Sequence, residues 1–374
     1  MLKRTRSFLV LVMLLMTVTM SAQVTTATMS GKVTAQDEPI IGATIVAIHE
    51  PSGTRYGTVT NVSGQFNLQG MRTGGPYKVE ISYVGYQTAI YKGINLLLGE
   101  NYVLNVSLKE SSELLDEVVV TASKESNMKS DRAGAIMNAN RDMISNTPTI
   151  SRSISDIMRL SPQGADVGNG FAVGGGNYRQ SFVTVDGAAF NNTFGLGGNL
   201  PANGSPISLD ALEQVTVAVT PFDVRQSGFT GGAINAVTRS GDNQFRGTAY
   251  MYFNNENLKG SKVDDYELLR SKAQYYTYGA SFGGPIIKDK LFFFVNGEYE
   301  DNVTAGSNYR PRTALGESYS GGNIHRPLQS DMDDMRGFLL NKYNFDPGKY
   351  NDYSTDTPAY RVMARIDWNA NQNN

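Results

Sequence analysis

Side chains that perform covalent or metal chemistry are scarce in this sequence. It contains two histidines, no cysteine and no Gly-x-Ser-x-Gly nucleophile motif. His49 has no second histidine near it along the chain, so an ordinary strand residue is a better interpretation than a metal ligand. The sequence therefore predicts a non-enzyme without catalytic residues, metal or cofactor. A site built from carboxylates alone is the one catalytic alternative left open.

A glycine-rich stretch at residues 164–176 is a second place to look for chemistry, because glycine loops can hold phosphates. No Gly-Lys-Ser or Gly-Lys-Thr occurs there, and no amphipathic helix follows. A loop that turns tightly in a crowded space explains the glycines better. We therefore do not expect nucleotide binding.

The third candidate is the main chain of Val118, Val119 and Val120. β-branched residues favour an extended backbone, and polar, charged segments flank these valines on both sides. Such a segment can wait as an unpaired strand until the sheet edge of a partner takes it up through main-chain hydrogen bonds. The alternative is that the valines form the last strand of the domain before them, since short apolar runs discriminate poorly.

The N-terminus predicts export. Lys3, Arg4 and Arg6 precede an unbroken apolar run at residues 8–16, and Ser21 and Ala22 precede Gln23 as a small-residue cleavage site. This is the pattern of a secretory signal peptide, here residues 1–22. No other run approaches the roughly 20 residues of a membrane helix, so any later membrane contact is expected from strands.

The composition points to an exported β-protein. A balance of 33 Lys and Arg against 35 Asp and Glu excludes a nucleic-acid-binding protein that relies on bulk positive charge. The charged fraction of 18% is low for a soluble protein, and 39 glycines, 20 tyrosines and 16 phenylalanines accompany it. Without cysteine, stability must come from packing rather than disulfides.

Short strand-like segments with turn residues between them fill residues 28–108. Tyr77, Val79 and Ile81 alternate with polar residues, which is typical of a strand with one buried face. The pattern predicts a β-sandwich of about seven strands, at residues 29–34, 41–49, 56–60, 65–68, 77–83, 86–91 and 102–108. The stretches 42–46, 57–68 and 81–88 resemble the carboxypeptidase regulatory-like domain over residues 28–109. That resemblance implies a prealbumin-like sandwich with no catalytic residues of its own.

Residues 131–241 mix helical and strand patterns. Ser153 can cap a short helix that Pro162 stops. Strands are expected at 181–187, ending in an Asp-Gly turn, and at 214–220 and 233–239, with a capped helical turn at 208–213. This segment is therefore predicted to be an α+β domain.

Three stretches of this segment, 183–188, 209–217 and 227–241, resemble the plug domain of TonB-dependent outer-membrane receptors. The plug-motif residues that the resemblance implies are Asp186, Gly187, Leu209, Asp210, Glu213, Gly228, Gly231, Gly232, Asn235 and Thr238. It also implies that residues 115–124, just before the plug, are the TonB box. The implied TonB-binding residues are Asp116, Glu117, Val118, Val119, Val120, Thr121 and Ala122.

From residue 245 the strand patterns become longer. Tyr360, Val362, Ala364, Ile366 and Trp368 alternate with Arg361, Met363, Arg365 and Asp367, and residues 276–282 alternate similarly. This favours a barrel wall with one face to lipid and one to the lumen. Connections that are long, short and long again fit the same interpretation. Residues 245–374 are thus predicted to be the first four strands of an outer-membrane β-barrel, and a closed barrel needs more strands.

The resemblance implies a mainly β protein of the outer membrane that imports a ligand with energy from TonB. The implied partners are TonB, outer-membrane lipid, a small ligand, glycan or peptide and, by analogy, a surface lipoprotein; no nucleic acid is expected. Ligand-binding residues are not identifiable from the sequence. The competing hypothesis is a secreted or cell-surface β-module that binds or adheres without transport.

Overall fold

The structure is a computed structural model of the 374-residue chain. It describes residues 25–110, 118–121, 136–149, 152–167, 170–191, 200, 205–219, 231–258, 260, 262–264, 266–267, 272–306, 309–319, 324–351 and 353–370. The expected signal peptide lies outside these residues. The chain divides into two compact units, one with residues 1–247, 281–296 and 362–374 and the other with residues 248–280 and 297–361.

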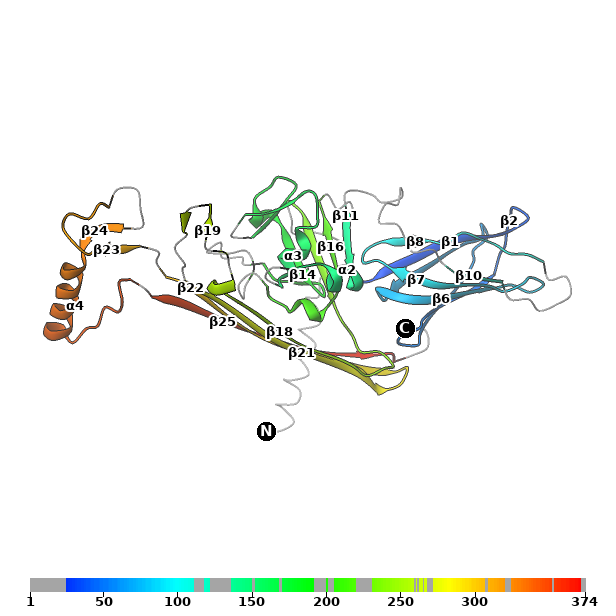
Figure 1. Cartoon of the computed structure of the whole chain (residues 1–374). Helices are drawn as coiled ribbons and strands as arrows, with labels where there is room; N and C mark the ends of the chain where they lie inside the picture. The colour runs from blue at the N-terminus through cyan, green and yellow to red at the C-terminus, as the bar shows by residue number, and fades with distance from the viewer. Residues whose placement is uncertain are drawn as a thin grey trace, which may run out of the picture. The chain divides into compact units, whose positions relative to one another are not determined.

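The first domain is a β-sandwich, as predicted (Figure 1). One sheet has the order β2-β1-β5, with β8 and β9 also paired to β1, and the other has the order β10-β7-β6-β3-β4. The strands are β1 (Ala27–Ala35), β2 (Glu38–Pro39), β3 (Thr44–His49), β4 (Thr54–Val59), β5 (Gln65–Met71), β6 (Gly74–Ser82), β7 (Ala89–Leu96), β8 (Asn101–Val103), β9 (Val106–Ser107) and β10 (Val118–Thr121).

Among the described residues, the core of the sandwich consists only of residues of the sandwich itself. Met29, Ile45, Tyr77 and Ile81 are among its fully buried side chains, and every buried member of the cluster lies between residues 27 and 108. The alternation of Tyr77, Val79 and Ile81 therefore faces this core, as its period of two predicts. A core closed within one segment indicates a domain that can fold independently.

Several strand bounds of the sandwich differ from those expected, and two of the differences have a local cause. Residues 86–91 were expected as one strand, but β7 begins at Ala89, because the main chain turns between Tyr83 and Tyr86 with Gly85 at a φ of 87°. The strand expected at 102–108 is divided into β8 and β9. The Asn105 side chain accepts a hydrogen bond from the Lys32 main-chain nitrogen at 3.0 Å, replacing a regular ladder bond there.

The expectation of an unpaired strand at Val118–Val120 is wrong. β10 pairs in parallel with β7 and forms the end of its sheet (Figure 1). The alternative interpretation, a last strand of the preceding domain, describes this conformation. A β-branched run next to an open sheet edge pairs with that edge because unpaired main-chain groups are costly.

Residues 136–241, called the plug segment here because of the resemblance described above, form an α+β domain (Figure 1). Its main sheet has the order β11-β16-β17-β14-β15, with β14 and β17 parallel, and β12 pairs with β13 separately. The elements are β11 (Ile136–Asn140), α2 (Arg141–Asn146), α3 (Ile154–Met158), β12 (Gly164–Asp166), β13 (Phe171–Val173), η2 (Tyr178–Gln180), β14 (Phe182–Val185), β15 (Ala188–Ala189), η3 (Leu209–Ala211), β16 (Leu212–Ala218) and β17 (Ala233–Thr238).

The local signals of the plug segment predicted α3 and η3, whereas α2 and η2 were not predicted. Ser153 is the N-cap of α3, and its main-chain nitrogen donates to the Asp156 carboxylate at 3.3 Å. Ile154, Ile157 and Met158 are fully buried in one hydrophobic cluster with Val215, Val217 and Ile234. The apolar face of α3 therefore packs against the sheet.

The long strands of the third segment form a meander. β18 (Arg246–Asn255), β21 (Ala273–Ile287), β22 (Leu291–Ala305) and β25 (Ser354–Trp368) are hydrogen-bonded in sequence order. Residues 288–290 alone join β21 to β22, and the other two connections are long, as expected. The long connections contain η4 (Glu256–Leu258), β19 (Lys262–Val263), β20 (Tyr266–Glu267), β23 (Arg310–Arg312), β24 (Ile324–Leu328) and the helix α4 (Gln329–Tyr343), which was not predicted.

The two faces of β25 differ as the alternation predicted. Tyr360, Val362, Ile366 and Trp368 are between 70% and 87% exposed, whereas Arg361 is 4% exposed. On β21, Tyr278 and Phe282 are exposed and Thr277 and Ser281 are buried. The apolar outer face of these strands is the face that a barrel turns to lipid.

Candidate functional site

The turn after β14 is the first part of the candidate site. Asp186 and Gly187 have positive φ angles of 48° and 83°, which suit an Asp-Gly hairpin turn into β15. The Asp186 carboxylate accepts hydrogen bonds from the main-chain nitrogen of Thr238 at 2.9 Å and from its hydroxyl at 2.5 Å. Two residues that the sequence singled out, 52 positions apart, thus lie together at the end of β17.

Asn235 and the two glycines before β17, Gly231 and Gly232, determine how closely the neighbouring segments approach β17. The Thr184 hydroxyl lies 2.7 Å from the Asn235 side-chain oxygen, so a buried polar pair joins β14 to β17. A Cβ added at Gly232 would lie 2.5 Å from Val173, and one at Gly231 would lie 3.2 Å from Gln180. These glycines are required by close packing rather than by a phosphate.

The helical turn η3 brings the second stretch that resembles the plug domain, residues 209–217, into contact with Arg239. Leu209 is buried, and Asp210 forms an ion pair with Arg239 at 3.6 Å while its carbonyl oxygen accepts from the same guanidinium at 3.2 Å. Arg239 also donates to Ser281 at 3.3 Å and lies over the Phe294 ring at 4.7 Å. Burial lowers the pKa of Arg239 from its usual value, and Arg141 contributes to the same direction.

Arg365 on β25 connects the plug motif to the long strands. Its Nη1 donates to the Thr238 carbonyl oxygen at 2.9 Å and lies 3.6 Å from the Asp186 carboxylate. Its Nη2 binds Asp367 at 2.9 Å, and Asp367 in turn pairs with Arg72 of the sandwich at 3.2 Å. One chain of charged groups therefore runs from the plug sheet through β25 to the sandwich.

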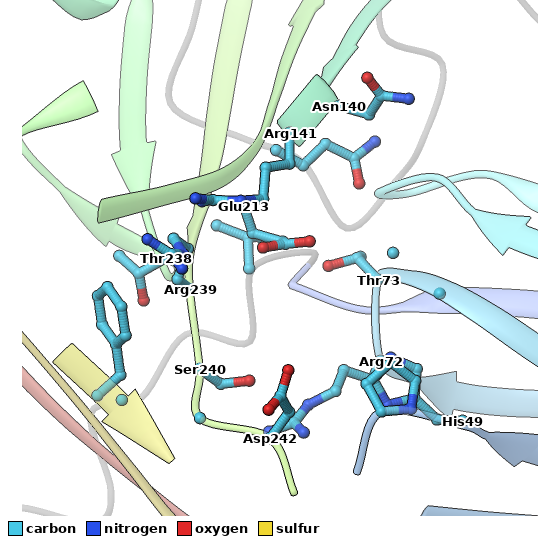
Figure 2. Close-up of a pocket in the computed structure, with 18 of the residues that line it drawn as sticks. His49, Arg72, Thr73, Asn140, Arg141, Glu213, Thr238, Arg239, Ser240 and Asp242 are labelled. Carbon is cyan, nitrogen blue, oxygen red and sulfur yellow. The ribbon is translucent and has the colours of Figure 1, made fainter. Parts of the chain in front are cut away.

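A polar cavity of about 240 Å³ lies beside this chain of charges (Figure 2). Figure 2 shows Glu213 with Arg141, Thr238 and Arg239 on the plug side of the cavity and with Thr73, Arg72 and His49 opposite. Burial raises the pKa of Glu213, although Arg141, Arg239, Arg72 and Arg365 each act to lower it. The cavity is lined by charged groups of both signs.

His49 belongs to a buried hydroxyl network. Its Nδ1 is 2.7 Å from the Ser52 hydroxyl, which is 2.7 Å from the Thr54 hydroxyl, and its ring packs on Tyr77 with centroids 5.0 Å apart. Burial, with a smaller contribution from Arg72, lowers the pKa of His49 to about 3. The histidine is therefore neutral at physiological pH and structural, as the sequence favoured.

Of the remaining site residues that the sequence predicted, some lie outside the described residues and the others form β10. Gly228, Asp116, Glu117 and Ala122 lie outside the described residues. Val118, Val119, Val120 and Thr121 form β10, which pairs with β7 of the sandwich. Sequence reasoning missed Arg72, Arg239 and Arg365. The alternation of β25 placed Arg365 on the inner face, but nothing in it indicated Thr238 as its partner.

Within the described part of the chain, no group of three or more histidine, aspartate or glutamate side chains could hold a metal ion. No helix there has both the length and the apolar character required to cross a membrane.

Two family models match the chain. Residues 28–109 match the carboxypeptidase regulatory-like domain, and residues 237–374 match the outer membrane beta barrel domain. The first match covers the β-sandwich, and the second covers the end of β17 and all the long strands. Both agree with what the sequence predicted for these segments.

The chain is also similar to curated proteins and to solved structures. The TonB-dependent transporter Oar of Myxococcus xanthus is 27% identical over 229 residues, or 59% of this chain and 20% of its own length. The TonB-dependent receptor SusC of Bacteroides thetaiotaomicron is 29% identical over 269 residues, or 68% of this chain and 24% of its own length. The outer membrane transporter YddB of Escherichia coli matches 63% of this chain and 31% of its own, with 13% identity and a TM-score of 0.44.

The chain spans about a quarter or less of the length of these two curated relatives, which are a transporter and a receptor. One sequence thus matches the carboxypeptidase regulatory-like domain and the outer membrane beta barrel domain, and it is also similar to two TonB-dependent proteins. The chain therefore carries an N-terminal carboxypeptidase regulatory-like domain and an outer membrane beta barrel domain, and it is similar to TonB-dependent transporters and receptors of the outer membrane.

Proposed function

We propose that this receptor imports an external ligand across the outer membrane and that TonB supplies the energy by binding residues 116–122. The observation that carries the proposal is the contact between the plug motif and β25. Arg365 holds the Thr238 main chain at 2.9 Å, so the plug sheet is attached to the long strands by polar contacts that a pull can break and that can form again.

The chemistry of the site supports transport rather than catalysis. Arg239 and Arg365 contact main-chain carbonyls, carboxylates and hydroxyls of the plug, and each of these contacts can be exchanged without a change in covalent bonds. Reversible attachment is what a gated channel requires. The competing adhesion function needs no plug and no apolar outer face, and β25 shows such a face.

The ligand class stays open among glycans, peptides and metal complexes. The connection between β22 and β25 contains the described elements β23, β24 and α4. Tyr309 and His325 pack there at 4.4 Å between ring centroids. We propose that such ordered loop elements, rather than the plug motif, select the ligand.

The test of TonB binding is Val119→Pro in the complete receptor. Proline removes a main-chain donor from the strand that TonB would take up, so binding of the purified periplasmic domain of TonB should fall at least tenfold. Val62→Pro is the matched control, because Val62 is exposed in the turn at Asn61–Gly64, where proline is favoured. Equal TonB binding by the correctly inserted Val119→Pro receptor and wild type would overturn the assignment.

A further inference from the structure

Three side chains of the polar cavity of about 240 Å³ present N–H donors that have no acceptor (Figure 2). Arg72 Nη1 and Gln214 Nε2 are buried and have no hydrogen-bond partner among the described residues, and Gln214 is only 2% exposed. Arg141, the first residue of α2, also lines the cavity and is in no ion pair within the described part of the chain. Since buried polar groups nearly always have partners, these donors indicate a site for an acceptor.

A β-bulge in β16 directs two consecutive side chains to this cavity. The register between β16 and β17 shifts between Leu212 and Gln214, so Glu213 is the additional residue. In a regular strand, successive side chains point to opposite faces, yet Glu213 and Gln214 both line the cavity. Bulges that redirect a side chain are over-represented next to functional sites. The bulge therefore supports a binding role for this part of β16.

Positive charge exceeds negative charge in the lining of the cavity. The carboxylates that line it are Asp142, Glu213 and Asp242, whereas the arginines are Arg72, Arg141, Arg239, Arg246 and Arg365. Asp242 already pairs with Arg246 at 3.5 Å. Arg239 and Arg365 are held by Asp210 and Asp367, which lie outside the lining. The donors that are still available, on Arg72, Arg141 and Gln214, suit an anion rather than a cation.

From these observations we propose that the cavity binds a small oxyanion, a phosphate or a carboxylate group, through Arg72, Arg141 and Gln214. Guanidinium groups recognise the oxygens of both classes, and the amide of Gln214 adds a neutral donor. Arg72 belongs to the sandwich, and Arg141 and Gln214 belong to the plug segment. A bound oxyanion therefore links these two parts of the chain. The inference concerns a site separate from residues 116–122 and does not depend on TonB binding.

Glu213 is the group of this site that opposes an anion. Burial raises the pKa of Glu213, although Arg141, Arg239, Arg72 and Arg365 act to lower it. When its carboxyl group takes up a proton, it no longer repels an anion and gains an O–H donor. Ionised Glu213 thus weakens anion binding, and a neutral side chain of the same size at this position should strengthen it.

The adjacent residues Glu213 and Gln214 allow a test with opposite expected signs. Isothermal titration calorimetry of the complete receptor with inorganic phosphate, in a chloride buffer, should show one phosphate per wild-type receptor. Gln214→Glu replaces a donor with a carboxylate of the same size and should weaken phosphate binding at least tenfold. Glu213→Gln should instead strengthen it severalfold. A general loss of packing would weaken binding in both variants, so it cannot produce this result.

The arginines of the site are tested with matched controls. Arg72→Gln should weaken phosphate binding at least tenfold, and Arg141→Gln gives the same test if loss of the pair between Arg72 and Asp367 prevents folding. Arg55→Gln removes the same charge from an exposed position of β4 outside the lining, so its affinity should equal that of wild type. Gln65→Glu, exposed on β5, is the corresponding control for Gln214→Glu.

Titration with succinate in place of phosphate distinguishes the two classes of oxyanion. Tighter binding of phosphate assigns a phosphate group to the site, and the reverse order assigns a carboxylate; both orders support the proposal. Wild-type receptor that binds neither probe at millimolar concentrations would overturn it, because water would then be sufficient for the buried donors. Equal phosphate affinity in wild type, Gln214→Glu and Arg72→Gln would also overturn it, because the anion would then bind elsewhere on the receptor.

Discussion

Arg365 Nη1 lies 2.9 Å from the carbonyl oxygen of Thr238 and 3.0 Å from its hydroxyl. One guanidinium of β25 therefore holds the last residue of β17 by both its main chain and its side chain. Asp367 and Asp186 flank the same guanidinium and compensate its charge. The plug motif that the sequence identified is thus completed by a residue more than 120 positions later in the chain.

Replacing Arg365 with leucine should loosen the plug while leaving the long strands folded. Hydrogen bonds to charged groups contribute about 1.5–3 kcal/mol, so the amides of β17 should open more easily by about 2 kcal/mol. Hydrogen exchange of residues 233–238 in the folded receptor measures this. Arg365→Lys should not rescue it, because an ammonium cannot reproduce the fork that contacts Thr238 and Asp367 together.

Arg246→Leu is the control for a nonspecific loss of positive charge. Arg246 pairs with Asp242 at 3.5 Å, but its side chain is 60% exposed, so the pair contributes less than about 1 kcal/mol. Exchange of β17 should be nearly unchanged in this variant. If the amides of β17 open equally easily in Arg365→Leu and Arg246→Leu, then Arg365 does not hold the plug specifically.

A second prediction concerns the buried charges of the long strands. Arg361 pairs with Glu298 at 2.9 Å and with Glu300 at 2.7 Å, and all three side chains are at most 6% exposed. The Tyr250 hydroxyl also donates to Glu298. Arg361→Met leaves two carboxylates without their cation and should cost about 3–5 kcal/mol.

The three charges should be strongly coupled. Arg361→Met combined with Glu298→Gln and Glu300→Gln removes the uncompensated charges and should recover most of the lost stability. Denaturant titration of the receptor folded into lipid vesicles measures both variants. Additive losses, with the triple variant the least stable, would contradict a coupled cluster.

The strands and the sheet faces were predictable because they depend on local periodicity. Val362 and Arg361 were assigned to opposite faces by parity alone, and their exposures of 87% and 4% confirm it. The Asp186-Gly187 turn and the Ser153 cap were also predictable, because turn and cap chemistry depends on residues two to four positions apart. The resemblance, and not periodicity, singled out Asp186 and Thr238.

The contacts of Arg365 and the parallel pairing of β10 could not be predicted in this way. Thr238 and Arg365 are 127 positions apart, and nothing in either local sequence specifies the other. Val118–Thr121 fits an unpaired strand and a sheet edge equally well, so only the open edge of β7 decides between them. α4 was missed because its apolar residues, such as Phe338 and Leu340, are exposed and form no buried stripe.

The third prediction is an acid effect in the sandwich. The folded domain keeps His49 neutral down to pH about 3, whereas the unfolded chain takes up a proton near pH 6.5. Since the unfolded state binds more protons between these values, this contribution to stability is complete above pH 6.5 and is lost as the pH falls towards 3. The full loss is on the order of 5 kcal/mol.

Urea titration of the isolated domain, residues 25–110, measures this effect, because its core is closed within the segment. His49→Gln lacks the titrating group, so the stability difference between wild type and variant should narrow as the pH falls from 6.5 to 4. Carboxylates contribute equally to both proteins and cancel in the difference. A difference that is independent of pH would contradict a neutral, buried His49.

The last prediction concerns the outer face of β25, where Val362 lies near the middle of the strand and is 87% exposed. Arginine facing lipid at the bilayer midplane costs about 2–4 kcal/mol, and less near the interfaces. Val362→Arg should therefore destabilise the receptor by about 2 kcal/mol or more in lipid vesicles. Met363, the next residue, packs against the plug core and is unsuited as the comparison, although parity alone would make it a tolerant lumen position.

Val362→Leu is the better control, because it changes size but keeps an apolar side chain towards lipid, and its stability should stay within about 0.5 kcal/mol of wild type. Denaturant titration in vesicles compares the two variants at one site, so local strand strain is shared between them. On a water-exposed face the order would reverse, since arginine is well tolerated there and leucine extends an apolar patch. Equal stability of Val362→Arg and wild type would mean that this face does not contact lipid, whereas a selective loss in Val362→Arg places the alternation of β25 at the lipid boundary.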